Sequence, residues 1–216
     1  NHGDMYVANQ NSWFSDGTGW RLGPVLPEFC NRGIAMGMEP RVALDCDGRL
    51  YYATHNTLTP GPLSPSSTIV FDESRHAIVA WVDDHLEVLD SNGWQPIPAS
   101  QGLPLTVGGT WLLYYQGSIH AAANVGGTTY IAKFDGNAWV SLSTLGLAGR
   151  TFESVSIDTT RYAIVATLRN GYVLEPAVAS FDGTAWRRAA YPGTAQAIQT
   201  YDSRNAMLLS GEPNFL

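Results

Sequence analysis

The chain has 216 residues, a formal net charge of −7 and charged side chains at only 14% of its positions, against 22 glycines and 7 tryptophans. This composition favours many short strands and turns over a helical bundle. The acidic balance, without a basic cluster, argues against nucleic acid and anionic membranes as partners. No apolar stretch reaches the length of a membrane-spanning helix, so we expect no membrane insertion.

A tryptophan-anchored phrase occurs four times along the chain, at residues 14–20, 89–94, 134–139 and 181–186. Each copy has an apolar residue, a tight turn of Asp or Asn with Gly, and then a tryptophan. Glycine supplies the positive φ that such a hairpin turn needs. The phrase therefore predicts four two-stranded hairpins, and we expect each large tryptophan ring to pack between neighbouring sheets.

A second phrase, a strand, an Asp-x-x-Arg-like turn and a very apolar strand, alternates with the first. Its copies lie at residues 42–53, 69–80, 112–123, 155–166 and 198–209. The spacing is about 43 residues for most copies, which is typical of the four-stranded repeat of a β-propeller. We predict an all-β fold, a small β-propeller of five blades formed by a single domain over residues 1–216.

One blade is expected to be degenerate. Too few residues separate the hairpin at 42–53 from the next copy for four strands and their turns, and the stretch at 57–66 is rich in proline, which cannot donate to a strand ladder. We predict a truncated blade with a long loop here; the alternative is four good blades with an inserted hairpin.

The two ends of the chain are complementary halves of one blade. The chain opens with an outer hairpin, over residues 5–20, and closes with an inner hairpin, over residues 198–209. We predict that the N-terminal outer strands pair with the C-terminal inner strands, which closes the ring and leaves no free sheet edge.

The two cysteines, Cys30 and Cys46, lie outside any CxxC motif or histidine cluster, so we expect no metal site. The sequence has no phosphate-binding glycine loop and no dinucleotide fingerprint, and we expect no cofactor. A disulfide between them is the favoured prediction, because Cys30 lies in a long irregular stretch that gains most from a cross-link. Two buried free thiols are the alternative. The disulfide would imply an oxidising compartment, so we expect a secreted or cell-surface protein.

The well-formed units resemble kelch-type repeats, as in the propeller of galactose-oxidase-like proteins. The matching features are a Tyr/Phe-Asp pair at the end of the first strand and an outer phrase that ends in Asp-Gly-x-x-Trp; the Gly-Gly doublet of that pattern is met most nearly by Gly126 and Gly127. The resemblance implies a binding platform, and several secreted propellers of this kind are lectins.

Candidate ligand-binding residues follow the second strand of each blade, where the loops of a propeller converge on one face. These exits carry polar residues of mixed sign: His55, Asn56, Asp83, His85, Asn124, Arg169 and Glu212. The alternative is that they are ordinary solvated turn residues, since Asn and Asp favour turns for backbone reasons.

Aromatic residues outside the tryptophan phrase are candidates for stacking on a sugar. They are Trp13, Trp81, Trp111, Tyr130, Tyr172 and Tyr191. Trp81 and Trp111 lie inside apolar strands and are expected in the core, whereas Trp13 and Tyr191 flank turns and are the preferred ligand contacts. His120, beside small alanines, is expected to be a core histidine.

The favoured function is a recognition module that binds carbohydrate in a lectin-like manner at the axial mouth of the propeller. One alternative is a carbohydrate-active hydrolase or lyase, with Asp83, Asp84 and Glu212 as the carboxylate candidates. The other is a protein-interaction platform from a larger toxin, adhesin or surface protein, with the proline-rich stretch at 57–66 as its apolar contact. The expected partner is thus a glycan or a protein.

Overall fold

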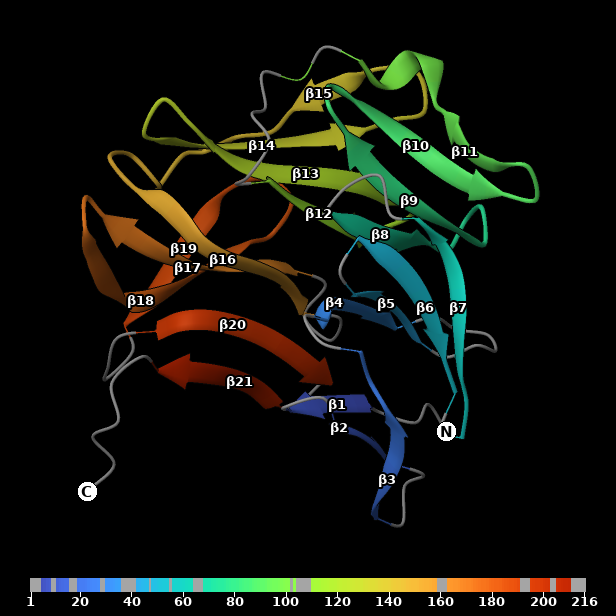
Figure 1. Ribbon diagram of the computed structural model, residues 1–216. Helices are drawn as coiled ribbons and strands as arrows, with labels where there is room; N and C mark the ends of the chain where they lie inside the picture. Colours follow the sequence, from blue (N-terminus) through green and yellow to red (C-terminus); the bar gives the residue numbers. More distant parts are fainter. Residues whose placement is uncertain are drawn as a thin grey trace. The chain divides into compact units, whose positions relative to one another are not determined.

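The computed structural model describes residues 5–8, 11–15, 19–27, 30–35, 42–46, 48–54, 56–63, 68–101, 103, 110–158, 163–190, 195–202 and 205–210. Two compact units comprise residues 1–82 with 86–97, and residues 83–85 with 98–216. Every sheet is an antiparallel meander in chain order (Figure 1). No helix in the described part of the chain is long and apolar enough to cross a membrane.

The first unit carries most of three sheets. Their strands are β1 (Met5–Ala8), β2 (Asn11–Ser15) and β3 (Trp20–Val25); β4 (Cys30–Ala35), β5 (Val42–Cys46), β6 (Arg49–Ala53) and β7 (Leu58–Leu63); and β8 (Ile69–Asp72), β9 (Ala77–Val82), β10 (His85–Asp90) and β11 (Gly93–Pro96). Apolar side chains of β5 and β6 form one cluster with those of β8 and β9, which includes Leu50 and Phe71. A second cluster gathers around Leu26 and Leu44.

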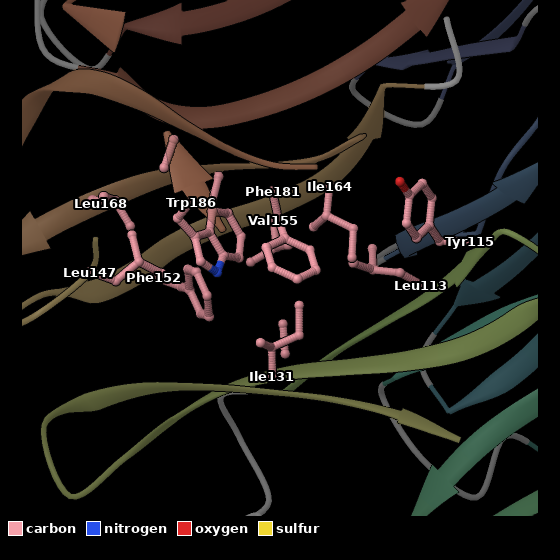
Figure 2. Close-up of a cluster of buried hydrophobic side chains, with 13 residues drawn as sticks. Leu113, Tyr115, Ile131, Leu147, Phe152, Val155, Ile164, Leu168, Phe181 and Trp186 are labelled. Atoms are coloured by element: carbon pink, nitrogen blue, oxygen red, sulfur yellow. The ribbon is translucent and has the colours of Figure 1, made fainter. Parts of the chain in front are cut away.

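The second unit carries two four-stranded sheets and a hairpin. Its elements are the 3₁₀ turn η1 (Pro98–Ser100); β12 (Thr110–Tyr115), β13 (Ser118–Val125), β14 (Thr128–Phe134) and β15 (Trp139–Ser141); β16 (Thr151–Asp158), β17 (Ala163–Asn170), β18 (Val173–Phe181) and β19 (Trp186–Ala190); and β20 (Ala195–Asp202) with β21 (Asn205–Ser210). Between the two sheets lies a core in which Ile131 faces Phe181, Ile164 and Trp186 (Figure 2). Apolar side chains on the buried faces of the strands thus pack neighbouring sheets against each other, as the repeat predicts.

The tryptophans of the repeated phrase whose side chains are described contact residues outside their own hairpins. The Nε1 of Trp94 donates to the carbonyl oxygen of Leu63, at the end of the preceding sheet, over 2.8 Å. Trp186 lies in the core shared by the two sheets, with its ring centroid 5.5 Å from that of Phe152. The Nε1 of Trp139 donates to the carbonyl oxygen of Ser100 in η1 over 2.6 Å. The predicted packing between sheets is confirmed for Trp94 and Trp186.

The sheet β4–β7 corrects the prediction of a truncated blade. It has four strands, and the hairpin predicted as its inner pair forms the second and third strands, β5 and β6. The proline-rich stretch forms β7 rather than a loop. β7 is the last strand of its sheet, so Pro60 and Pro62 lie where a missing N–H is tolerated. The first strand of the sheet is formed by residues 30–35, a stretch that the sequence analysis expected to be irregular.

Cys30 and Cys46 form the predicted disulfide. The two residues face each other in the register of β4 and β5, so the bond joins neighbouring strands of one sheet. Cys46 is buried, at 1% exposure.

Within the described residues, β1–β3 and β20–β21 form the two sheets with fewer than four strands. Their pairing into one blade, and with it the closure of a single domain over residues 1–216, stays a prediction.

Candidate functional site

The hairpin turn between β17 and β18 presents the most exposed aromatic side chain among the described residues. Asn170 and Val173 face each other in the ladder, so Gly171 and Tyr172 form the two-residue turn. Gly171 has φ 61°, and a positive φ at this first turn position is what a type II′ turn requires. Tyr172 is 99% exposed and Val173 68%.

The side chain of Arg169 holds the backbone of this turn by a hydrogen bond and is itself held by Glu153. The Nε and Nη2 of Arg169 donate to the two carboxylate oxygens of Glu153, the latter over 2.9 Å. The Nη1 of Arg169 donates to the carbonyl oxygen of Tyr172 over 3.2 Å. The hydrogen bond to Glu153 raises the pKa of Arg169 above its ordinary value. Tyr172 thus combines a solvated ring with a fixed main chain.

A β-bulge aims Glu153 at Arg169. Phe152 faces Leu168 and Ser154 faces Thr167, so Glu153 is the extra residue of β16. Bulges of this kind redirect a side chain that the regular pleat would aim elsewhere.

Asn124 links the neighbouring sheet to the same place. Its Nδ2 donates to the carbonyl oxygen of Phe152 over 2.8 Å, and its Oδ1 accepts from the Phe152 amide over 2.7 Å. Asn124 lies near the end of β13, and Phe152 precedes Glu153. Asn124 and Arg169 thus both contact residues at the start of β16, and the structure brings these two residues of the predicted site close to the same place.

A second ionic cluster fixes the connection that enters β16. Glu175 accepts from the Nε of Arg150 over 2.6 Å and from the Nη1 of Arg188 over 3.1 Å, and its side chain is only 12% exposed. Glu175 lies where the register of β18 shifts against β17. The cluster ties the residue before β16 to the third and fourth strands of the sheet.

The other predicted site residues lie elsewhere or are not described. Asp83 and Asp84 are exposed in the β9–β10 turn, where Asp83 has φ 50° and the Nδ1 of His85 is 3.1 Å from Asp84 Oδ1. Asn56 lies in the β6–β7 turn. It follows the third strand of its sheet and not the second, so its predicted placement was wrong, because the strand order over residues 30–63 was one strand out.

Four further predicted residues fall outside the described side chains. His55, Tyr191 and Glu212 lie outside the described residues, and Trp13 lies in β2, of which the backbone alone is described. Their assignment to a ligand site stays a prediction.

The aromatic candidates divide by burial. Trp81 is 2% exposed, and Trp111 packs edge-on against Phe152, as expected for core residues. The Tyr130 hydroxyl lies 3.0 Å from that of Ser141. Tyr172 is therefore the candidate that the structure presents most openly, and the Asn-Gly-Tyr turn was the sequence signal for it.

Two buried titratable groups have pKa values that their surroundings shift. His120 is 3% exposed, and its burial lowers the pKa to about 4. Burial by itself would raise the pKa of Asp72, but hydrogen bonds from Ser74 and Arg75 and the charge of Arg75 hold it below its ordinary value. Among the described residues, no three His, Cys, Asp or Glu side chains are placed to hold a metal ion.

Comparisons with known proteins define the fold class. No family model and no curated protein matches the chain. Similar solved structures include a chain of the nidogen/laminin complex (TM-score 0.65, 11% identity, 95% of this chain and 84% of that chain). The β-propeller domain of Cps50 (Swd1) from Myceliophteria thermophila is another (TM-score 0.65, 9% identity, 97% and 77%). YCF48 from Cyanidioschyzon merolae is a third (TM-score 0.57, 12% identity, 95% and 78%).

The chain also resembles part of a larger extracellular domain, from a B. thetaiotaomicron protein described as a one-component system (TM-score 0.59, 12% identity). It covers only 31% of that chain, while 96% of its own length is matched. Together with the four-stranded antiparallel sheets, these likenesses show that the protein is a β-propeller; the identities are too low to show more than the fold.

Proposed function

We propose that this propeller is a secreted or cell-surface recognition module that binds carbohydrate, with the β17–β18 turn as a contact point. The observation that carries the proposal is Tyr172, which is 99% exposed while its carbonyl oxygen accepts a hydrogen bond from Arg169. A ring on a fixed backbone offers a large contact area and loses little conformational freedom on binding. The face of a tyrosine ring suits the apolar face of a sugar.

Polar groups beside the ring would orient the sugar hydroxyls. The carboxamide of Asn170 is exposed in the same turn. Arg169 uses three of its five N–H groups on Glu153 and Tyr172, so donors remain. The other residues predicted for the ligand site, such as Trp13 and Glu212, contribute to binding in this proposal only if they lie near this turn.

A protein ligand is the second candidate, and Val173 is the observation that favours it. Val173 is 68% exposed beside Tyr172, and an aromatic residue with an apolar neighbour is a common anchor of protein interfaces. Extracellular and complex-forming propellers stand among the similar structures, as the nidogen/laminin complex illustrates.

The disulfide supports the proposed compartment, because such bonds persist where the surroundings are oxidising. The kelch-type assignment of the repeats remains part of the proposal. The hydrolase alternative lacks a comparable observation: Asp83 and Asp84 are neighbours on one exposed turn, whereas a hydrolytic pair must flank the scissile bond.

A glycan array tests the proposal with four proteins: the wild type, Tyr172→Ala, Tyr172→Trp and Leu145→Ala. Leu145 is 74% exposed in the connection between β15 and β16 and serves as the surface control. We expect wild-type binding to fall about tenfold or more in Tyr172→Ala, which corresponds to a loss of about 1.4 kcal/mol or more, and to persist in the other two.

Three outcomes would oppose the proposal. Unchanged binding by Tyr172→Ala would remove the turn from the site. A wild-type protein that binds no glycan would leave the protein ligand as the better candidate. Glycans recovered in cleaved form by mass spectrometry would favour the hydrolase.

A further inference from the structure

Two asparagine–glycine pairs lie in exposed hairpin turns, and they differ in how the glycine amide is used. The pairs are Asn92–Gly93 and Asn170–Gly171. This dipeptide is prone to deamidation, because glycine has no side chain to hinder attack by its own amide nitrogen on the asparagine carboxamide. The attack requires that nitrogen to be free of other bonds and the asparagine side chain to rotate.

The Gly93 amide belongs to the ladder of its hairpin. Gly93 is the first residue of β11 and faces Asp90, the last residue of β10. The turn is also closed by the Asn92 amide, which donates to Asp90 Oδ1 over 2.7 Å. In a two-residue turn the N–H of the residue after the turn commonly donates to the carbonyl oxygen of the residue before it. A nitrogen engaged in this way is held away from the preceding side chain.

The Gly171 amide lies beyond the end of its ladder. The last facing pair is Asn170 and Val173, and Gly171 is the first residue of the turn between them. The hydrogen bond that closes a two-residue turn is commonly donated by the residue after the turn, here Val173, and not by Gly171. All four residues from Asn170 to Val173 are exposed.

The charges beside the two pairs differ. Arg169 contacts the carbonyl oxygen of Tyr172 over 3.2 Å, so its guanidinium lies at the turn, where Glu153 balances its charge. The Asn92 turn is preceded by Asp90, whose negative charge disfavours the deprotonated, nucleophilic form of the Gly93 amide nitrogen.

We propose that Asn170 is a site of spontaneous deamidation in the folded protein, and that the fold protects Asn92. The Gly171 amide nitrogen loses its proton to solvent base and bonds to Cγ of Asn170, and the carboxamide nitrogen leaves as ammonia. Water then opens the resulting succinimide by breaking one of its two C–N bonds. The products are an aspartate or an isoaspartate at position 170, and no reagent other than water is consumed.

The modification would act on the turn that the proposed function uses, and this consequence rests on that function. A carboxylate at position 170 competes with Glu153 for Arg169, which holds Tyr172. An isoaspartate also lengthens the backbone of the turn. We expect both products to weaken binding through Tyr172, so the turn would lose affinity with the age of the molecule.

Peptide mapping by mass spectrometry tests the modification itself. The intact wild-type protein is incubated at mildly alkaline pH, folded in buffer or unfolded in urea, and conversion at both asparagines is followed with time. We expect Asn170 to convert several-fold faster than Asn92 in the folded protein and the two rates to approach each other in urea. Equal rates in the folded protein, faster conversion at Asn92, or no conversion at Asn170 would overturn the proposal.

The variants Asn170→Gln and Asn92→Gln separate the site from the function. Asn170→Gln should abolish the fast conversion, and Asn92→Gln should leave it unchanged. Aged and fresh wild-type protein are then compared on the glycan array. Conversion without loss of binding would leave the modification site standing and remove only its consequence.

Discussion

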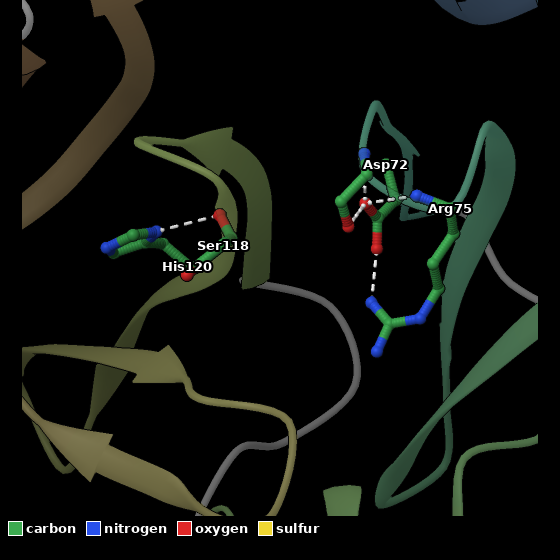
Figure 3. Close-up of polar contacts among 5 residues, drawn as sticks. Asp72, Arg75, Ser118 and His120 are labelled. Carbon is green, nitrogen blue, oxygen red and sulfur yellow. Dashed lines mark hydrogen bonds and ion pairs between the residues drawn. The ribbon is translucent and has the colours of Figure 1, made fainter.

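At the scale of single residues, His120 shows how burial fixes a charge state. Its ring lies edge-on to Tyr115, with centroids 5.3 Å apart, and Nδ1 is 3.1 Å from the carbonyl oxygen of Ser118 (Figure 3). Burial is the largest cause that lowers its pKa from 6.5 to about 4, and the charge of Lys133 acts in the same direction. The folded protein therefore keeps this histidine neutral.

The depressed pKa predicts a stability that falls with acidification. Between pH 6.5 and about 4 the unfolded chain binds a proton at His120 that the folded chain does not, so the free energy of unfolding decreases as the pH falls through this window, by on the order of 3 kcal/mol. Urea unfolding at a series of pH values measures it. The variant His120→Gln should lose this part of the pH dependence, whereas His76→Gln, at an exposed turn, should keep it; the same profile for both variants would contradict the assignment.

Asp72 shows at the same scale what the repeated Asp-x-x-Arg turn does. Asp72 is 0% exposed, and its carboxylate accepts from the Ser74 amide (2.9 Å), the Ser74 hydroxyl (2.6 Å), the Arg75 amide (3.2 Å) and the Arg75 guanidinium (Figure 3). A buried carboxylate is stable only with such compensation. The sequence marks the turn; the burial of its carboxylate follows from packing that the sequence does not show.

At the scale of elements, the connection between β15 and β16 contains two glycines with different surroundings. Gly146 has φ 96°, and a Cβ placed on it would lie 2.8 Å from the carbonyl oxygen of Trp186. Gly149 has φ 71°, and a Cβ there would meet nothing within 4 Å. The connection thus passes close to the start of β19 at one glycine and through open space at the other.

This difference predicts unequal costs for two otherwise equal substitutions. Gly149→Ala should destabilise the protein by about 1 kcal/mol, the cost of a left-handed conformation for alanine. Gly146→Ala should cost about 2–4 kcal/mol, because the clash with Trp186 adds to that strain. Midpoints of urea unfolding compare the two, and equal midpoints would show that the connection does not pack against β19.

The sequence predicted the strands with a strong period and missed those without one. The tryptophan phrases at 134–139 and 181–186 became the β14–β15 and β18–β19 hairpins, with Asp135 and Asp182 accepting backbone N–H groups in their turns. Over residues 30–63 the repeat predicted the wrong strand order. The turn after Asp45 resembles the turn between the first and second strands of the other copies, but here it joins β5 to β6, the second and third strands.

The candidate site was predictable only in part. Asn124 and Arg169 were identified because they follow apolar second strands. Glu153 was missed because it is the extra residue of a bulge, and a bulge shifts register without a mark in the spacing. Tyr172 was among the aromatic candidates of the sequence, but its 99% exposure depends on which segments cover the turn, and the spacing of residues along a sequence does not show that.

At the scale of the whole molecule, the prediction that remains is closure of the ring by the two ends of the chain. If β1–β3 and β20–β21 complete one blade, removal of residues 1–25 exposes a sheet edge, and exposed edges promote association. We expect the shortened chain to lose thermal stability and to self-associate in analytical ultracentrifugation. A synthetic peptide of residues 1–25 should restore the monomer; a shortened chain that stays monomeric and equally stable would contradict closure by these strands.

The central claim is that ligand binds at the β17–β18 turn, and hydrogen exchange with the most strongly bound glycan of the array tests it most directly. Amide exchange is compared between the free and the glycan-bound protein. Protection at residues 169–174 and at the start of β16, with none in the β9–β10 turn, is the predicted result, because Tyr172 and its brace through Arg169 and Glu153 would be covered. Protection confined to other loops, with exchange at residues 169–174 unchanged, would contradict the account.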